Sequence, residues 1–422
     1  YYTPITALDF EGLYPSIMMA HNLCYSSLVM DPKYDNLPGV TYERFGNHTF
    51  AQGVPSLLPS ILSELKQFRK QAKKDMAMST GATKQMFNGK QLAYKISMNS
   101  VYGFTGASRG MLPCVAIAST VTMKGRGMID DTKTYVEKNF PGAKVRYGDT
   151  DSVMVEFDVG DRKGPEAIEY SWELGERAAA ECSKLFKAPN NLELEKVYCP
   201  YFLYSKKRYA AKLWTKGKDG NMNMDYIDVK GLQLVRRDNT PHVREVCKEL
   251  LDVVLESNDT VAPKALARKR AVELLEGEVS NEKLVLSQQL GDSYKSSNLA
   301  HVRVRDKMKL RQPGSEPQSG DRVPYILLDT GDHRAKAFEK SEDPVYTKEK
   351  KLKVDYVYYF KNKFLNPVCD LLEPLFTNPK EEIFGDLIQS TKPQKKPRAP
   401  KTPKGPKKKQ LLVSDIFKQE TP

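Results

Sequence analysis

Two short apolar runs around an acidic turn constrain the fold of this chain more than any other feature. Residues 144–147 (KVRY) and 152–157 (SVMVEF) flank the sequence GDTD. Strand-like runs joined by a tight turn rich in Gly and Asp are typical of a β-hairpin. Because the flanking strands are apolar, we expect the acidic tip to be held against a core.

This tip carries two carboxylates, Asp149 and Asp151, with no basic residue between them. A fixed pair of close carboxylates suits a hard divalent cation, and Mg²⁺ in particular combines few carboxylates with substrate phosphates. Asp and Gly also favour ordinary turns. From this motif alone, a metal site and a plain acidic turn are equal alternatives.

A third aspartate, Asp9, ends the strand predicted at residues 4–10, and the turn sequence EGLYPS follows it. Backbone N–H groups in such a turn can hold phosphate oxygens. Considered alone, a strand-ending turn aspartate is the simpler interpretation.

Apolar spacing predicts an antiparallel helical hairpin. One helix starts near Ser56, Gly81 interrupts the pattern, and a second helix covers about residues 83–101. Arg69 and Lys73 lie four apart on the first helix, where like charges cost helix stability unless a polyanion lies between them. An exposed basic face is the simpler alternative.

On the second of these helices, Lys95, Asn99 and Tyr102 share one face. A lysine for phosphate and an aromatic ring for a base predict a nucleotide-binding face. The alternative is a solvated lysine and a core tyrosine.

The rest of the chain alternates between helical and strand-like patterns. Residues 115–138 indicate a helix, residues 193–230 indicate strands, and residues 240–375 are mostly helical with a Gly/Pro-rich interruption at 312–325. The cluster SKKRY at residues 205–209 suits either contacts to backbone phosphates or a solvated basic turn.

The net charge of +13 is uneven, because residues 392–409 carry nine Lys or Arg and no acid. This distribution suits a polyanionic partner. The six cysteines are scattered, which excludes a Cys-x-x-Cys metal site and fits a reducing intracellular compartment. No apolar run approaches a membrane span. The chain opens at Tyr1 without a Met or a signal pattern, so we expect a segment of a longer protein.

The order of these motifs resembles that of family B DNA polymerases. Residues 9–17 resemble motif A, residues 95–103 motif B and residues 147–152 (YGDTDS) motif C, and the last is highly specific to the family. The sequences SVYGFTG at residues 100–106 and GDRVPY at residues 320–325 further resemble delta-type replicative enzymes.

The resemblance covers most of the chain and implies an α/β (α+β) fold arranged as a right hand, with an antiparallel β palm, helical-hairpin fingers and a mostly helical thumb. It implies these boundaries: palm at residues 1–55 and 115–235, fingers at 56–114, thumb at 236–375, and a basic disordered tail at 376–422.

The implied function is template-directed DNA synthesis, in which deoxynucleotides are added to a primer 3′-hydroxyl by two-metal phosphoryl transfer with two Mg²⁺ ions. By resemblance, Asp9 and Asp149 bind the metals together with the Phe10 carbonyl, and Asp151 is an acidic partner beside them. A third acid near the metals is either Glu193 or Glu195.

The resemblance also implies a set of nucleotide and DNA contacts. Tyr14 corresponds to a steric gate that excludes the ribose 2′-hydroxyl, Tyr102 packs at the nascent base pair, and Lys95 is the candidate proton donor to the leaving pyrophosphate. The triphosphate is held by Arg69, Lys73, Lys95, Asn99 and the backbone amides of Gly12, Leu13 and Tyr14. The primer-template DNA is contacted by Lys206, Lys207, Arg208 and Tyr209.

Two features depart from the family pattern. Glu11 and Gly12 stand where relatives usually carry small polar residues, and a Lys/Pro-rich tail replaces a cysteine-rich one. The tail resembles those of large DNA viruses, and its basic arm suits a nuclear targeting signal or a DNA tether. We therefore expect a nuclear or viral replication site. The tail ends in a motif that resembles a sliding-clamp ligand, with anchors at Gln410, Val413, Ile416 and Phe417.

Three rival functions are weaker. A non-catalytic DNA-binding relative would lack Asp9 or Asp149, and both are present. A metal-dependent nuclease would need exonuclease motifs, which in this family precede motif A and are not visible here. An RNA polymerase is opposed by Tyr14.

Overall fold

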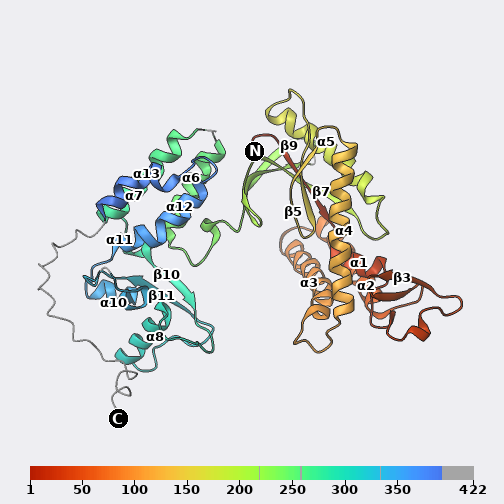
Figure 1. Cartoon of the computed structure of the whole chain (residues 1–422), viewed down its shortest axis with the longest axis horizontal. Helices are drawn as coiled ribbons and strands as arrows, with labels where there is room; N and C mark the ends of the chain where they lie inside the picture. The colour runs from red at the N-terminus through yellow and green to blue at the C-terminus, as the bar shows by residue number, and fades with distance from the viewer. Residues whose placement is uncertain (218, 257–258, 333, 392–422) are drawn as a thin grey trace, which may run out of the picture. The chain divides into compact units, whose positions relative to one another are not determined.

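The computed structural model divides into two compact units (Figure 1). The first comprises Tyr1–Ala267 with Asp370–Leu375, and the second comprises Arg268–Cys369 with residues 376–391. In the part of the chain that the structure describes, no helix has the length and apolar character needed to cross a membrane. The described residues are 1–217, 219–256, 259–332 and 334–391.

A six-stranded antiparallel sheet lies in the first unit, in the order β5-β6-β1-β7-β8-β9. β1 is bonded along both edges, and its residues are buried except for the half-buried Asp9. A strand covered on both faces needs apolar side chains almost throughout, which explains the sequence ITALDF. The predicted hairpin at residues 144–157 is confirmed as β5 and β6. The strand bounds are β1 Ile5–Phe10, β5 Lys144–Asp149, β6 Ser152–Glu156, β7 Leu192–Ser205, β8 Arg208–Lys216 and β9 Met222–Lys230.

Two helices cover one face of this sheet. α4 (Val115–Asn139) contacts β5 and β6, while α5 (Gly164–Ser183) contacts β1 and β7, and the two helices contact each other (Figure 1). Leu8 and Phe10 of β1 point into this core. Ile5 and Ala7 alternate to the opposite face, as the period of a strand requires. There they pack against a cluster that includes Tyr198, Tyr201 and Tyr209.

Close packing of α5 on β1 depends on Gly175, because a Cβ at this position would lie 2.6 Å from Thr6 Cγ2 and 3.1 Å from Leu194 Cδ1. We expect Gly175→Ala to lower the free energy of unfolding by about 1–3 kcal/mol, since overpacking forces side chains or backbone to shift. Urea denaturation measures the change. Gly127→Ala on α4, where a new Cβ meets nothing within 4 Å, is the control and should preserve or raise stability. Equal stability of both variants would contradict the packing argument.

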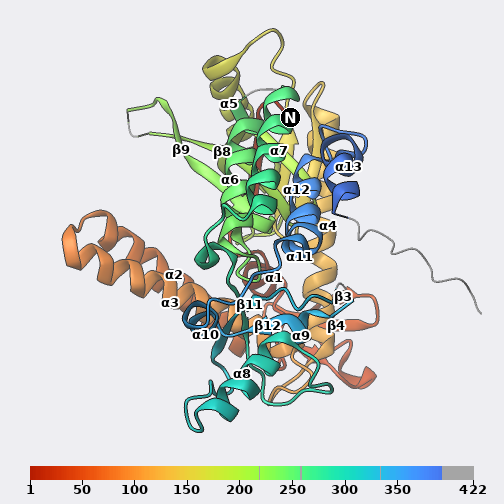
Figure 2. The same ribbon diagram turned by 90° about the vertical axis from the view of Figure 1, so that its left-hand side faces the viewer.

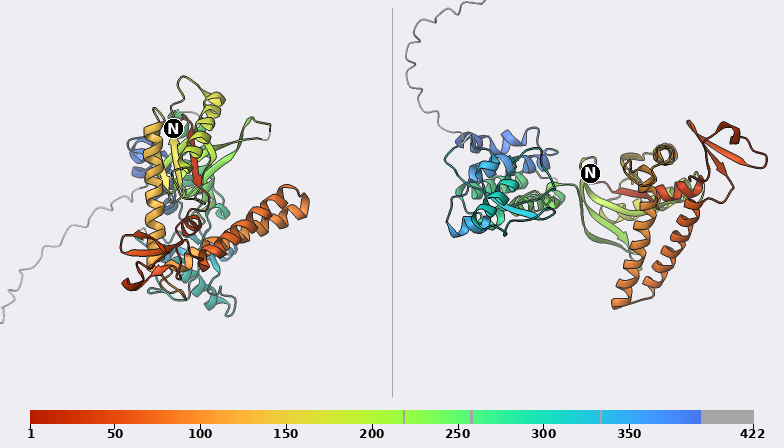
Figure 3. Two further views of the ribbon diagram at one scale, coloured as in Figure 1. Left: turned by 90° about the vertical axis from the view of Figure 1, so that its right-hand side faces the viewer. Right: turned by 90° about the horizontal axis from the view of Figure 1, so that it is seen from below.

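α2 (Leu57–Ala77) and α3 (Gly81–Gly106) form the antiparallel hairpin predicted from residues 56–101. Figures 2 and 3 show the hairpin projecting from the rest of the first unit. Gly81 begins α3 with φ +55°, a left-handed conformation that favours glycine, which explains the break between the helices. α1 (Leu13–Ala20) packs against both helices and against α4.

A small antiparallel sheet follows α1 in the first unit. Its strand order is β2-β4-β3, and a short helical turn, η1, precedes β3. Two further elements of this unit, η2 and α6, follow β9. The bounds are β2 Leu28–Val29, η1 Pro32–Tyr34, β3 Thr41–Phe45, β4 His48–Gln52, η2 Gln233–Val235 and α6 Pro241–Glu256.

The second unit combines helices with a three-stranded antiparallel sheet of order β10-β11-β12. The prediction that residues 240–375 are mostly helical is confirmed for most of this segment. The three-stranded sheet within it was not predicted. β10 and β12 are too short to show a strand period. The elements wholly within this unit include η3 Asn281–Leu284, β10 Leu286–Gln289, α8 Ala300–Arg311, β11 Arg322–Leu327, α9 Ala337–Lys340, β12 Ser341–Glu342, α10 Pro344–Glu349, α11 Tyr356–Tyr359 and η4 Phe360–Phe364. Two helices, α7 (Val261–Glu276) and α12 (Leu365–Leu372), belong partly to each unit.

The expected disordered tail at residues 376–422 is wrong for its first part, because α13 occupies Pro379–Ser390. The Asn378 side chain accepts a hydrogen bond from the Glu381 N–H and Pro379 stands at the helix start, which are strong helix-start signals. Ile383 and Phe384 are buried, so tertiary packing stabilises this short helix. The proposed clamp motif at residues 410–417 lies outside the described residues.

Candidate active site

A cleft of about 660 Å³ lies in the first unit and gathers most of the residues singled out from the sequence. Its walls come from the β1–α1 turn, from α2 and α3, from the tip of the β5–β6 hairpin, and from the start of β7. The lining residues are Asp9, Phe10, Glu11, Gly12, Leu13, Tyr14, Pro15, Arg69, Lys73, Lys95, Met98, Asn99, Tyr102, Thr150, Asp151, Glu193, Leu194 and Glu195.

The β1–α1 turn supplies backbone donors to this cleft. Gly12 caps α1 in a left-handed conformation (φ 56°, ψ 59°), and as a glycine it has no side chain that could accept a hydrogen bond from the helix N–H groups. The first N–H groups of a helix have no acceptor within it, so those of Leu13 and Tyr14 are available at this end. A helix start with free N–H groups is suited to binding an anion.

Asp9 in β1 and Asp151 in the β5–β6 turn form part of the acidic wall. The Phe10 N–H donates to the Asp151 carbonyl oxygen at 2.8 Å, which fixes the hairpin tip beside the end of β1. Burial, together with the charges of Asp151 and Glu195, raises the pKa of Asp9 to about 7. Burial and the charges of Asp149 and Glu195 likewise raise the pKa of Asp151. These acids are therefore crowded and destabilised in their ionised form.

Asp149 is placed differently from Asp151. Asp9 and Asp149 both pair with Ser152, on opposite edges of β6, so their Cα atoms are separated by two strand spacings, or about 10 Å. The Asp149 carboxylate is 2.9 Å from Lys207 Nζ and does not line the cleft. Thr150 between the two aspartates has φ +50°, a left-handed conformation, and the residue that follows it, Asp151, lines the cleft together with Asp9.

The third acid left open by the sequence is Glu193 or Glu195, and both line the cleft. Glu193 pairs directly with Asp9 across β1 and β7 and accepts a hydrogen bond from Asn191 at 3.0 Å. Only Glu195 contributes to the raised pKa values of both Asp9 and Asp151. Glu195 therefore has the stronger electrostatic link to the acidic wall.

The acidic wall fits a divalent cation that is shared with a substrate. No group of three or more His, Cys, Asp and Glu side chains between residues 1 and 391, outside the few undescribed positions, has a complete metal-ligating arrangement. Mg²⁺, however, takes only one or two carboxylates and completes its shell with water and phosphate. A cation between Asp9 and Asp151 would also favour their ionised forms, which the protein alone disfavours.

The opposite wall of the cleft is basic. α2 contributes Arg69 and Lys73, and α3 contributes Lys95 and Asn99. Arg69 Nε donates to Gln91 Oε1 at 3.4 Å, which ties the two helices together near the cleft. The charge of Lys95 lowers the pKa of both Asp9 and Asp151, so this lysine faces the acidic wall.

Tyr14 and Tyr102 form an aromatic pair at the edge of the cleft, with ring centroids 4.4 Å apart and planes inclined by 47°. Gly125 of α4 lies behind Tyr14, and a Cβ at this position would come 3.4 Å from Tyr14 Cε1. The ring is therefore confined by α4 on one side and by Tyr102 on another.

The basic cluster at residues 205–209 lies at the β7–β8 turn, and its side chains have different surroundings. Lys207 pairs with Asp149, and Arg208 lies 3.7 Å from Asp370. Lys206 is exposed. The ring of Tyr209 is buried in the tyrosine cluster of the sheet, so it supports the turn rather than presenting a surface.

Sequence reasoning missed Lys66 of α2, whose Nζ lies 3.2 Å from Glu11 Oε2. Lys66 precedes Arg69 by one helical turn, so the same spacing argument could have found it. It also missed Met98 and Leu194, which line the cleft and show no distinguishing pattern in the sequence.

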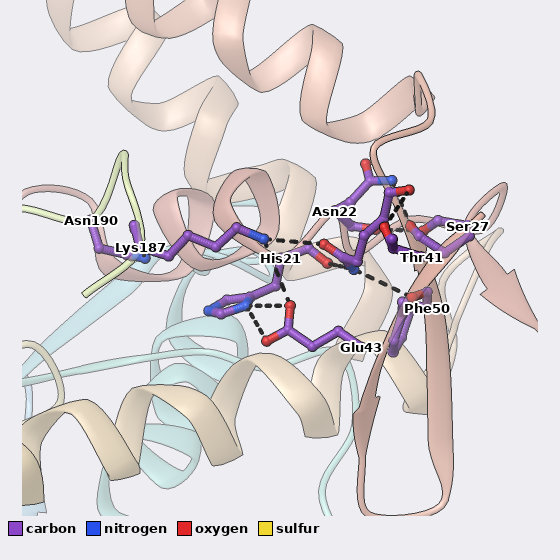
Figure 4. A network of polar contacts seen from close by, with 10 residues as sticks. His21, Asn22, Ser27, Thr41, Glu43, Phe50, Lys187 and Asn190 are labelled. Carbon is purple, nitrogen blue, oxygen red and sulfur yellow. Dashed lines mark hydrogen bonds and ion pairs between the residues drawn. The ribbon is translucent and has the colours of Figure 1, made fainter. Parts of the chain in front are cut away.

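A second polar cluster fixes the end of α1 that is remote from the cleft (Figure 4). His21 Nδ1 lies 2.8 and 2.9 Å from the two carboxylate oxygens of Glu43 in β3, and Lys187 Nζ lies 3.8 Å from the same carboxylate. Asn22 donates to the Ala51 carbonyl oxygen of β4. Since α1 carries Tyr14 at its other end, these contacts help to set the position of the cleft wall.

The chain belongs to DNA polymerase family B, because residues 1–375 match that family. This confirms the resemblance found in the sequence. The chain is 42% identical over 404 residues to the DNA polymerase of Paramecium bursaria Chlorella virus NY2A, and the match covers 91% of this chain and 43% of that protein. The chain is also 40% identical over 434 residues to the DNA polymerase delta catalytic subunit of Candida albicans, a match that covers 98% of this chain and 40% of that protein. It is 41% identical over 399 residues to the DNA polymerase delta catalytic subunit of Glycine max, a match that covers 91% of this chain and 36% of that protein. The chain thus spans less than half the length of these relatives.

Proposed function

We propose that this chain is the polymerising part of a template-directed DNA polymerase, which adds deoxynucleotides to a primer 3′-hydroxyl in DNA replication. The observation that supports this best is one cleft with three kinds of wall. Carboxylates come from β1 and the β5–β6 tip, cations come from α2 and α3, and backbone N–H groups come from the start of α1. Transfer of a nucleotide from a triphosphate with bound metal ions needs all three together.

In this proposal the chain is arranged as a right hand. The six-stranded sheet with α1, α4 and α5 corresponds to the palm, at residues 1–55 and 115–235, and the α2–α3 hairpin corresponds to the fingers, at residues 56–114. Residues 236–375 correspond to the thumb. The antiparallel sheet and the projecting hairpin support this division.

Two divalent ions, which we take to be Mg²⁺, would be held by Asp9, Asp151 and the Phe10 carbonyl. The resemblance to family B polymerases implied Asp149 as the second carboxylate. We prefer Asp151 because it lines the cleft, whereas Asp149 pairs with Lys207 and would support the site from behind. The bound ions would activate the primer hydroxyl and neutralise charge on the leaving pyrophosphate.

The incoming deoxynucleoside triphosphate would be held from two sides. Arg69, Lys73, Lys95 and Asn99 face it from the helical hairpin, and the N–H groups of Gly12, Leu13 and Tyr14 face it from the β1–α1 turn. Lys95 Nζ would donate a proton to the leaving pyrophosphate, and its electrostatic effect on Asp9 and Asp151 supports its closeness to the reaction. Tyr102 would pack at the nascent base pair.

Replacement of Arg69 by Ala should raise the KM for the nucleotide by tens of fold with a smaller effect on kcat. A charge-assisted hydrogen bond to phosphate is worth about 1.5–3 kcal/mol, which corresponds to roughly 10- to 150-fold. Steady-state primer extension at varied nucleotide concentration gives both constants. Lys74→Ala on the exposed side of the same helix is the control. An unchanged KM in Arg69→Ala would remove Arg69 from the site.

DNA and a sliding clamp are the proposed macromolecular partners. Lys206, Lys207 and Arg208 at the β7–β8 turn would contact the backbone of the primer-template. The clamp ligand at residues 410–417 is proposed from sequence alone, because it lies outside the described residues. A nuclear or viral replication site is the proposed location, which agrees with the names of the similar proteins.

Primer extension by the full-length protein on primed DNA tests the proposed function directly. Extension that requires a divalent cation and stops on chelation would support it. Binding of primed DNA without extension under any divalent cation would instead favour a non-catalytic scaffold.

A further inference from the structure

The ion pair between Glu11 and Lys66 has no part in the roles proposed above. Lys66 Nζ lies 3.2 Å from Glu11 Oε2 and also 3.5 Å from the carbonyl oxygen of Pro189. The side chains of Lys66 and Glu11 are only 28% and 32% exposed, so water and salt screen this pair less than a surface pair.

The pair joins two walls of the cleft. Glu11 belongs to the β1–α1 turn, which is held in place by a 3.0 Å hydrogen bond from the Glu11 N–H to the Asn191 carbonyl oxygen. Lys66 lies on α2 one turn before Arg69 and two turns before Lys73, on the same helical face. The ion pair therefore fixes the distance between the phosphate-binding cations of α2 and the N–H groups that begin α1.

The charge of Glu11 gives the pair a second effect. Glu11 lines the cleft, where a free carboxylate would repel a triphosphate over a few ångströms. Lys66 neutralises this charge in place. Arg69, Lys73 and Lys95 then remain available for the nucleotide.

We propose that Lys66 and Glu11 are positioning residues for the incoming nucleotide. The pair braces α2 against the β1–α1 turn and masks the Glu11 carboxylate. This inference rests on the proposed polymerase function of the cleft. Neither side chain is placed among the reacting groups, so the brace controls nucleotide affinity and leaves the chemical step unchanged.

The test compares Lys66→Met, Glu11→Gln and the double variant in the full-length protein, by KM and kcat for a deoxynucleotide in primer extension. Lys66→Met should raise KM about five- to twentyfold, because it removes the brace and leaves Glu11 uncompensated in the cleft. Glu11→Gln should raise KM only about two- to fivefold, because it removes the brace alone. The double variant should match Glu11→Gln, and kcat should stay within about twofold of wild type in all three.

Two controls isolate the brace. Lys66→Arg retains the charge and should retain most of the wild-type KM. Lys70→Met removes a charge from an exposed position on the same helix and should leave KM unchanged. Melting temperatures of all variants, measured alongside, separate an effect on affinity from an effect on folding.

Several results would overturn the inference. These are an unchanged KM in Lys66→Met, a double variant whose KM is the product of the two single effects, or a Lys70→Met effect equal to that of Lys66→Met. A wild-type protein that extends no primer would instead refute the proposed polymerase function, and the proposed role of the Glu11–Lys66 pair would then be refuted as well. Activity of the wild type thus distinguishes the two failures.

Discussion

Replacement of Asp151 by Asn is expected to lower kcat for primer extension by at least about 10³-fold, since divalent ions supply several kcal/mol of charge stabilisation. Asp9→Asn should have an effect of the same size. Asp9 and Asp151 are the two aspartates that line the cleft, and the charge of Asp151 contributes to the raised pKa of Asp9. In the proposed reaction, removing either charge would weaken cation binding beside the triphosphate. Single-turnover extension with saturating Mg²⁺ measures the loss.

Matched variants show which of the two aspartates at the hairpin tip is needed for primer extension. Asp149→Asn should retain more activity than Asp151→Asn, because Asp149 is paired with Lys207 and does not line the cleft. Asp130→Asn, at an exposed position of α4, should behave as wild type. DNA binding should persist in every variant. If Asp149→Asn abolished extension while Asp151→Asn remained active, Asp149 would regain the metal-binding role that the family resemblance implied.

Replacement of Tyr14 by Ala is expected to reduce discrimination against ribonucleotides by about 10²-fold, since a steric clash in a packed site costs up to about 3 kcal/mol. Tyr102 on one side and Gly125 of α4 on the other confine the Tyr14 ring, so it cannot easily move aside for a 2′-hydroxyl. The ratio of kcat/KM for matched deoxyribonucleotides and ribonucleotides gives the discrimination.

Tyr14→Phe is the control for this prediction, because it retains the ring and should retain discrimination. Efficient use of ribonucleotides by the wild type would favour an RNA polymerase instead. Unchanged discrimination in Tyr14→Ala would show that another group excludes the 2′-hydroxyl.

The sequence predicted the elements of the site because each has a local signal. Alternating apolar residues gave the hairpin at residues 144–157, and helical spacing placed Lys95, Asn99 and Tyr102 on one face. Family resemblance supplied the order of the motifs. Four of the five predicted site groups consequently meet around one cleft in the structure.

Side-chain direction at the hairpin tip could not be predicted in the same way. Asp151 lines the cleft with Asp9, while Asp149 pairs with Lys207, and the residue between them, Thr150, has a left-handed backbone. These placements are consequences of tertiary packing. Asp and Gly alone indicate only that a turn is present.

Contacts between distant segments were also beyond local patterns. Lys66 and Glu11 are far apart in the chain, and only the docking of α2 on the β1–α1 turn brings them together. α13 was missed because Lys/Pro-rich sequence follows it closely, although its cap and buried Ile383 and Phe384 define it clearly in the structure.

The central place of β1 determines when this site can form during protein synthesis. Ile5 pairs with Glu156 on one edge and with Tyr198 on the other, so β1 leaves the ribosome long before either neighbouring strand. Until β7 has been translated, the apolar ITALDF strand has unpaired edges and needs protection from association with other chains. Contacts this distant in sequence also slow folding. Asp9 therefore reaches its final environment only after β7 has been translated.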